Sequence, residues 1–98
     1  MEHGSVIAPA QLIGQRYGLA VKVVHLEMLD SSEVILTKIE SAFTPKTRMV
    51  FISHILYATG RRMPAEELRR VTKDRGILLM LDGAQTGGHI ELDMARSG

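Results

Sequence analysis

The fold is decided by residues 77–85, Ile77-Leu78-Leu79-Met80-Leu81-Asp82-Gly83-Ala84-Gln85. Five consecutive apolar residues between Gly76 and Gly83 have the length and the flanks of a strand that is buried on both faces, as strands are in a parallel sheet. Such a strand brings Asp82 to its carboxyl end. In open α/β sheets the carboxyl ends of the strands face the ligand crevice, so this carboxylate is predicted to bind a ligand.

The composition is that of a globular protein. The 98 residues form at most one small domain, and a chain of this size buries a smaller fraction of its surface than a full enzyme domain does. Apolar residues make up 45% of the chain and charged residues 23%, which argues against disorder. We therefore expect a folded domain, or a part of one that needs a partner or a further segment.

Charge and cysteine content exclude several classes of function. The net charge is +1 and basic residues never run longer than a pair, so we expect neither nucleic acid nor a membrane as a partner. The absence of cysteine excludes disulfides, thiolate nucleophiles and cysteine-bound zinc. No apolar stretch is long enough to span a membrane and no signal peptide is recognisable, so the expected location is the cytoplasm.

Helical and extended patterns alternate along the chain. Helices are predicted at residues 5–17, 30–45 and 64–75, and strands at residues 19–26, 49–55 and 77–81. Asp30 and Glu33 resemble a capping box at the start of the second helix, and Gly18 and Gly76 are expected to end the first and the third. The helix residues predicted to face the core are Ile35, Ile39, Ala42, Phe43, Leu68 and Val71. This order of elements predicts a parallel sheet with right-handed crossovers.

Polar side chains follow the last two predicted strands. His54 lies near the end of one strand, and Asp82 and Gln85 follow the other, so parallel topology would open them towards one crevice. The chain near Glu2-His3 is expected there as well. A carboxylate, two imidazoles and an amide can bind a metal, carry out acid/base chemistry or hold a heteroaromatic cofactor, and their spacing alone does not choose among these.

Several known sites have little support in the sequence. A metal site is not predicted, because no pair has His-x-x-x-His spacing and the candidate ligands are scattered over loops. The Gly-x-Ser-x-Gly motif of hydrolases is absent, and a pyrophosphate loop is disfavoured because Asp82 lies in the glycine turn and would repel the phosphates. In a dry crevice an aspartate can keep a pyridine nitrogen protonated, which makes the ring an electron sink.

Three segments carry a family resemblance, and they are Glu2-His3-Gly4-Ser5, residues 53–60 and residues 81–89. They resemble successive motifs of the class V aminotransferases, which include cysteine desulfurases and isopenicillin N epimerase-like enzymes. The linking residues 46–50 and 64–68 resemble the family too, so the resemblance covers essentially the whole chain. It implies pyridoxal 5'-phosphate (PLP) as the cofactor. It also implies an α/β fold, a three-layer parallel-sheet fragment from the middle of the large domain of fold-type I PLP-dependent transferases.

The resemblance implies roles for residues that match the family. Asp82 would pair with the protonated pyridine nitrogen, and Gln85 would hydrogen-bond the phenolic oxygen of the cofactor. His3 would stack on the ring, which suits a planar imidazole. His54 and Thr59 match positions that approach the cofactor or the substrate in this family.

The catalytic lysine of the family is the part of the pattern that we do not find. It would lie shortly beyond Gly98, and none of Lys22, Lys38, Lys46 and Lys73 matches its motif. We therefore expect residues 1–98 to be a single partial domain that is inactive alone and binds PLP noncovalently at most.

The complete enzyme would act on an amino acid, by aminotransferase, desulfurase or epimerase chemistry, and would form a homo-oligomer, by analogy a dimer. The alternative is a naturally short, non-catalytic domain that binds a small molecule or associates with itself. Self-association would follow because a truncated sheet leaves apolar edges and faces uncovered.

Overall fold

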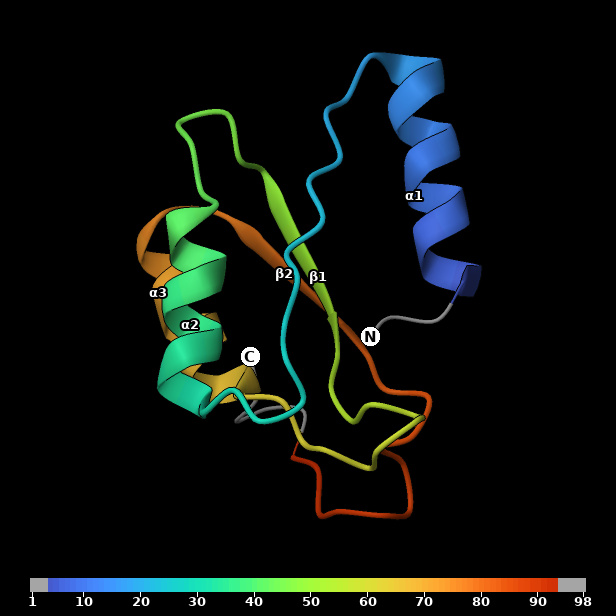
Figure 1. The fold of residues 1–98 in the computed structure, drawn as a ribbon, viewed down its shortest axis with the longest axis vertical. Helices are drawn as coiled ribbons and strands as arrows, with labels where there is room; N and C mark the ends of the chain where they lie inside the picture. Colours follow the sequence, from blue (N-terminus) through green and yellow to red (C-terminus); the bar gives the residue numbers. More distant parts are fainter. Residues whose placement is uncertain (1–3, 94–98) are drawn as a thin grey trace.

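The computed structural model describes residues 4–93 and shows a parallel α/β arrangement (Figure 1). Its elements are α1 (Gly4–Tyr17), α2 (Ser32–Ser41), β1 (Met49–Ser53), α3 (Ala65–Asp74) and β2 (Leu78–Asp82). The two strands pair in parallel, with Met49 opposite Leu78 and Ser53 opposite Asp82. The predicted α/β class and the parallel direction of these two strands are therefore confirmed.

Local signals explain where most of these elements end. Gly18 follows α1 with a φ of 68° and Gly76 follows α3 with a φ of 65°, a left-handed conformation that glycine adopts without a steric cost. Pro64 precedes the first residue of α3, where its missing N–H leaves no helical hydrogen bond unmade. The predicted positions of α1, α3, β1 and β2 are accordingly close to those observed.

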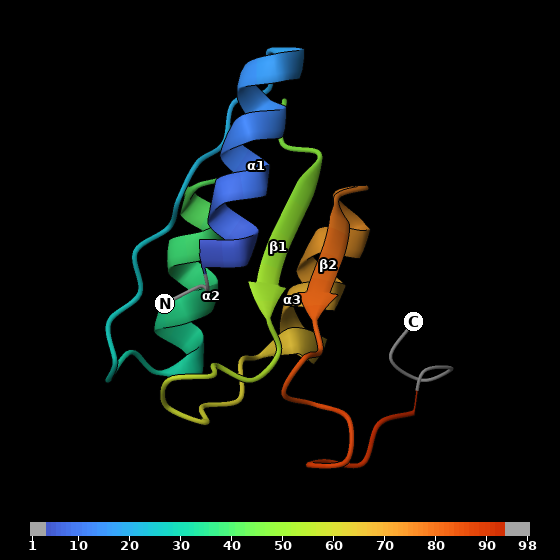
Figure 2. The same ribbon diagram turned by 90° about the vertical axis from the view of Figure 1, so that its right-hand side faces the viewer.

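The strand predicted at residues 19–26 is not formed. This segment runs along the β1 side of the sheet (Figures 1 and 2), but no backbone hydrogen bonds join it to β1 in the part of the chain that the structure describes. Its valines favour an extended backbone, but a strand also needs a hydrogen-bonded neighbour. Val24 and Leu26 pack against the hydrophobic core instead, so the segment covers the core without extending the sheet.

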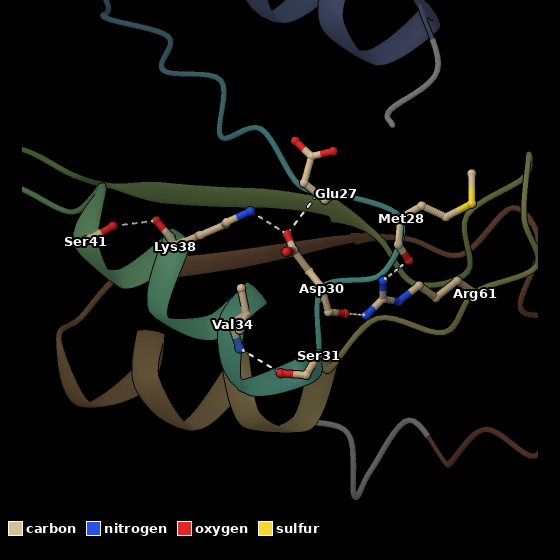
Figure 3. Close-up of polar contacts among 8 residues, drawn as sticks. All are labelled: Glu27, Met28, Asp30, Ser31, Val34, Lys38, Ser41 and Arg61. Atoms are coloured by element: carbon tan, nitrogen blue, oxygen red, sulfur yellow. Dashed lines mark hydrogen bonds and ion pairs between the residues drawn. The ribbon is translucent and has the colours of Figure 1, made fainter.

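The start of α2 differs from the predicted capping box. Ser31 is the N-cap residue, and its Oγ accepts a hydrogen bond from the backbone N–H of Val34 at 3.3 Å. Asp30 instead accepts hydrogen bonds from the backbone N–H of Glu27 at 2.8 Å and from Lys38 Nζ at 2.6 Å (Figure 3). The hydrogen bond from Lys38 lowers the pKa of Asp30 and so favours the ionised carboxylate. This carboxylate binds Lys38 and the backbone of Glu27 and does not cap α2.

A single hydrophobic core lies between the sheet and the pair α2 and α3. Its buried members are Ile35, Ile39, Ile52, Met63 and Leu68. Three of these were predicted to face inward from α2 and α3, whereas the predicted Ala42, Phe43 and Val71 are only partly buried. The core therefore holds α2 and α3 on one face of the sheet.

The opposite face of the sheet is left largely uncovered by the residues that the structure describes. Side chains alternate between the two faces of a strand, and Leu78 and Met80 on this second face are 70% and 53% exposed. The prediction that this strand is buried on both faces is therefore wrong for the described residues. α1 lies on the uncovered side (Figures 1 and 2), but its Leu12 and Ile13 are exposed too, and the packed three-layer arrangement stays a prediction.

Arg61 ties the loop after β1 to the segment before α2. Its guanidinium donates hydrogen bonds to the carbonyl oxygens of Met28, at 2.8 Å, and of Asp30 (Figure 3). These contacts join Arg61 to residues that lie 33 and 31 positions earlier in the chain. Arg61 thus fixes one border of the carboxyl edge of the sheet.

Arg61→Ala is expected to lower the free energy of unfolding by about 1–2 kcal/mol, because two carbonyl groups lose a charged donor. The adjacent Arg62 is a matched control, since its ion pair with Glu66 at 3.9 Å is exposed. Arg62→Ala should change the free energy of unfolding by less than about 0.5 kcal/mol. Urea unfolding of both variants measures the difference, and equal losses would contradict the anchoring role of Arg61.

Candidate functional site

The carboxyl ends of β1 and β2 point to the same edge of the sheet (Figure 2). The backbone N–H of His54 donates to the carbonyl oxygen of Asp82 at 2.9 Å, which extends the pairing by one hydrogen bond beyond the strands. Residues 54–62 and 83–90 then leave the sheet at this edge. The structure thus brings together the backbones of two residues that the sequence predicts in one crevice.

The Asp82 side chain is held in a defined orientation. Its Oδ1 accepts a hydrogen bond from the backbone N–H of Ala84 at 2.9 Å, an arrangement in which an aspartate closes a turn two residues ahead. Its Oδ2 accepts no hydrogen bond from any residue that the structure describes, and the residue is partly buried. A carboxylate with one oxygen held in this way and no hydrogen bond to the other from the described residues can accept a charge-assisted hydrogen bond from a protonated ring nitrogen.

Gln85 lies in the turn that Asp82 begins. The backbone N–H of Thr86 donates to the carbonyl oxygen of Gly83 at 2.8 Å and closes this turn. Gln85 itself is exposed, so its amide is accessible to a ligand. The turn therefore presents an oriented carboxylate and an accessible amide within four positions of the chain.

The His54 imidazole is buried. Only 5% of the residue is exposed, and its Nδ1 lies 3.2 Å from Thr86 Oγ1. Burial lowers the pKa of His54, the positive charge of Arg62 lowers it further, and the negative charge of Glu66 opposes both. The buried ring therefore favours its neutral form and lies against Thr86, whereas Asp82 remains partly exposed.

Thr59 lies at the surface of the loop that follows β1. Its Oγ1 accepts a hydrogen bond from the backbone N–H of Arg61 at 3.3 Å, and the loop is closed by a hydrogen bond from the N–H of Leu56 to the carbonyl oxygen of Arg61 at 2.9 Å. The structure places Thr59 at the same edge of the sheet as Asp82, without a contact between them. The predicted site residue His3 lies outside the described residues.

Two residues at this edge were not assigned by sequence reasoning. Thr86 is 1% exposed and bonds His54, although it stands within the motif that supplied Asp82 and Gln85. Ser53 is buried directly opposite Asp82, so its side chain lies on the same face of the sheet. The neighbouring sequence does not predict either position, because both depend on how β1 and β2 are aligned.

One hollow lies at the start of α3, beside Arg62 and Glu66, and another lies at the opposite end of the sheet, beside Arg48 and Gly76. Neither is lined by Asp82 or Gln85.

Within residues 4–93 no group of three or more histidine, aspartate or glutamate side chains is placed to hold a metal ion. In the same range no helix is long and apolar enough to cross a membrane.

Comparisons with known proteins agree with each other. The family model described as "Aminotransferase class-V" matches residues 1–98. The chain is 34% identical over 98 residues to a probable cysteine desulfurase of Mycolicibacterium paratuberculosis, which covers all of this chain and 14% of that protein. It is 35% identical over 85 residues to isopenicillin N epimerase of Streptomyces clavuligerus, which covers 86% of this chain and 21% of that protein.

A third relative is also much longer than this chain. A probable cysteine desulfurase of Xylella fastidiosa is 30% identical over 98 residues, covering all of this chain and 23% of that protein. The chain therefore spans between 14% and 23% of the length of these three curated relatives.

The buried His54 predicts a specific dependence of stability on pH. Its pKa is lowered in the fold, so between that value and the unfolded value of about 6.5 the unfolded state binds more protons. The contribution of His54 to stability is fully present above about pH 6.5 and is lost as the pH falls towards the pKa of the folded state. Urea unfolding between about pH 7 and pH 5 should show this loss.

His54→Phe should flatten this dependence, because the buried position no longer titrates. His25 is exposed, so His25→Phe serves as a matched control and should keep the dependence of the original chain. An unchanged pH dependence in His54→Phe would show that another group causes the loss.

Proposed function

Because this chain belongs to the class V aminotransferase family, we propose that it is the central segment of a PLP-dependent enzyme that acts on an amino acid. The observation that carries the proposal is the partly buried Asp82 carboxylate at the carboxyl end of β2, whose Oδ1 is held by the N–H of Ala84 and whose Oδ2 has no hydrogen bond from the described residues. This is the arrangement that a protonated pyridine nitrogen requires of its partner.

The residues present fit the cofactor. PLP, when bound, supplies an electron sink for charge at the α-carbon of an amino acid. Asp82 would keep the proton on the ring nitrogen, and the accessible amide of Gln85 would donate to the phenolic oxygen. His3 would stack on the ring, and the exposed Thr59 would lie near the substrate. The fixed Oδ1 of Asp82 supports this assignment, because an oriented carboxylate need not reorganise to hold the proton.

The lysine that the family attaches to the cofactor would come from outside this chain. Lys38 is held by Asp30 at 2.6 Å, and Lys22 reaches the carbonyl oxygen of Ala42 at 3.5 Å. Lys46 lies in the turn before β1, and Lys73 lies in the last turn of α3. These positions are on the helices or towards the amino ends of the strands, away from Asp82.

Residues 1–98 would form a partial domain that other segments of the protein complete. The exposed Leu78 and Met80 support this, since a strand of this composition is normally covered on both faces. The short span relative to the three relatives supports it too. A complete protein of this kind would have three packed layers and would act in the cytoplasm as a dimer.

A second candidate function is favoured by the same uncovered face. A naturally short chain could cover Leu78 and Met80 by associating with itself, without catalysis. The intact mass of the protein from its native host separates the two. A mass above that of Met1 to Gly98 supports the enzyme segment, and a mass equal to it supports the short domain.

Asp82→Asn in the complete protein tests the enzyme directly. Asparagine keeps an acceptor for the N–H of Ala84 but removes the charge, so activity should fall on the order of 100-fold or more. Turnover of cysteine and a panel of other amino acids measures the loss, and the visible absorbance of bound PLP reports cofactor binding.

The matched control is Asp74→Asn, at an exposed position at the end of α3, which should leave activity unchanged. A folded Asp82→Asn protein with full activity would rule out the assigned role.

A further inference from the structure

Two buried polar side chains at the carboxyl edge make a contact that the proposed function does not use. His54 is 5% exposed and Thr86 is 1% exposed, although they are 32 positions apart in the sequence. Their side chains meet through His54 Nδ1 and Thr86 Oγ1 at 3.2 Å. Burial of a hydrogen-bonding group costs stability unless the group finds a partner, and this contact gives each of the two side chains one partner.

Thr86 is the centre of the turn that carries the proposed cofactor residues. Its backbone N–H donates to the carbonyl oxygen of Gly83 at 2.8 Å, and its own carbonyl oxygen accepts from the N–H groups of His89 and Ile90 at 3.1 and 3.3 Å. These hydrogen bonds stay within the turn. The contact with His54 is different, because it joins the turn to the end of β1.

The position of Thr86 couples this contact to the site. Gln85 precedes it directly, and Asp82 begins the same turn through its hydrogen bond with Ala84. A displacement of Thr86 therefore moves Gln85 by a similar amount and changes the turn against which Asp82 is oriented. Misplacement of a binding group by about 1 Å is enough to lower a reaction rate strongly.

Among the described residues, the imidazole has one hydrogen-bond partner for its two nitrogens. Nε2 of His54 is buried without a hydrogen-bond partner among the described residues. A neutral ring can share one hydrogen bond with the hydroxyl of Thr86, as donor or as acceptor, whereas a protonated ring would need acceptors for two N–H groups. The charges that act on this ring are that of Arg62, which disfavours the protonated form, and that of Glu66, which favours it, and the hydrogen bond with Thr86 needs only the neutral ring.

We propose that His54 and Thr86 are positioning residues, whose hydrogen bond fixes the turn of residues 83–90 to β1 and thereby sets the place of Gln85 and Asp82 at the cofactor. The inference rests on the proposed function for the identity of the ligand. The fixing of the turn itself depends only on the contacts of this chain.

The test compares variants of the complete protein. Thr86→Val keeps the volume of the side chain and removes its hydroxyl. Thr86→Ser keeps the hydroxyl and removes only the methyl group. Thr72→Val is the matched control, since Thr72 is also 1% exposed and its Oγ1 bonds the carbonyl oxygen of Leu68 within α3, away from the site. His54→Phe removes the same contact from its other side, so the result does not depend on one variant folding.

Three readouts are needed. Amide hydrogen exchange of the protein without PLP should become faster at residues 83–90 in Thr86→Val and in His54→Phe, with α2 unchanged. The visible absorption maximum of bound PLP should shift, because it depends on hydrogen bonds to the ring. Turnover should fall about tenfold or more, with Thr86→Ser close to the original protein and Thr72→Val unaffected in all three.

The outcomes separate this inference from the proposed function. Unchanged exchange at residues 83–90 in both Thr86→Val and His54→Phe would overturn the positioning pair. Faster exchange with an unshifted absorption maximum and full turnover would overturn its link to the cofactor. An original protein that binds no PLP would overturn the proposed function, and the exchange result would then still decide whether the pair fixes the turn.

Discussion

The parallel pairing of β1 and β2 is the constraint on which the rest of the structure depends. The register places Ser53 opposite Asp82, and a shift by one residue would turn every side chain of one strand to the other face. With this register Ile52 and Leu79 reach the core that α2 and α3 share, and the next hydrogen bond joins His54 to Asp82. Core packing and the geometry of the carboxyl edge are thus consequences of one alignment.

Local patterns predicted most elements, and long-range contacts account for the exceptions. The apolar run before Asp82 and the glycines after α1 and α3 act through neighbouring residues, so they could be recognised in the sequence. The segment at residues 19–26 has the composition of a strand, but pairing with a distant strand decides its state. Asp30 looked like a helix cap, and a lysine eight positions away occupies its carboxylate instead.

In the candidate site, too, some features follow from local patterns and others from long-range contacts. The position of Asp82 follows from the strand that it ends. Gln85 was predicted from its place after that strand and from the motif that resembles the family. The meeting of His54 with Thr86 was not predictable, because it requires the relative position of two strands. Exposure of β2 was missed for a related reason: burial depends on what covers a strand as well as on its own residues.

The uncovered face of the sheet has a consequence for the order of events in folding. The core lies on the face of the sheet that α2 and α3 cover, so it can form without burying Leu78 and Met80 on the other face. Leu78 and Met80 remain exposed on that face, and folding intermediates that expose apolar surface are prone to aggregate. Until this apolar face is covered, collisions with neighbouring molecules therefore compete with correct assembly of the region.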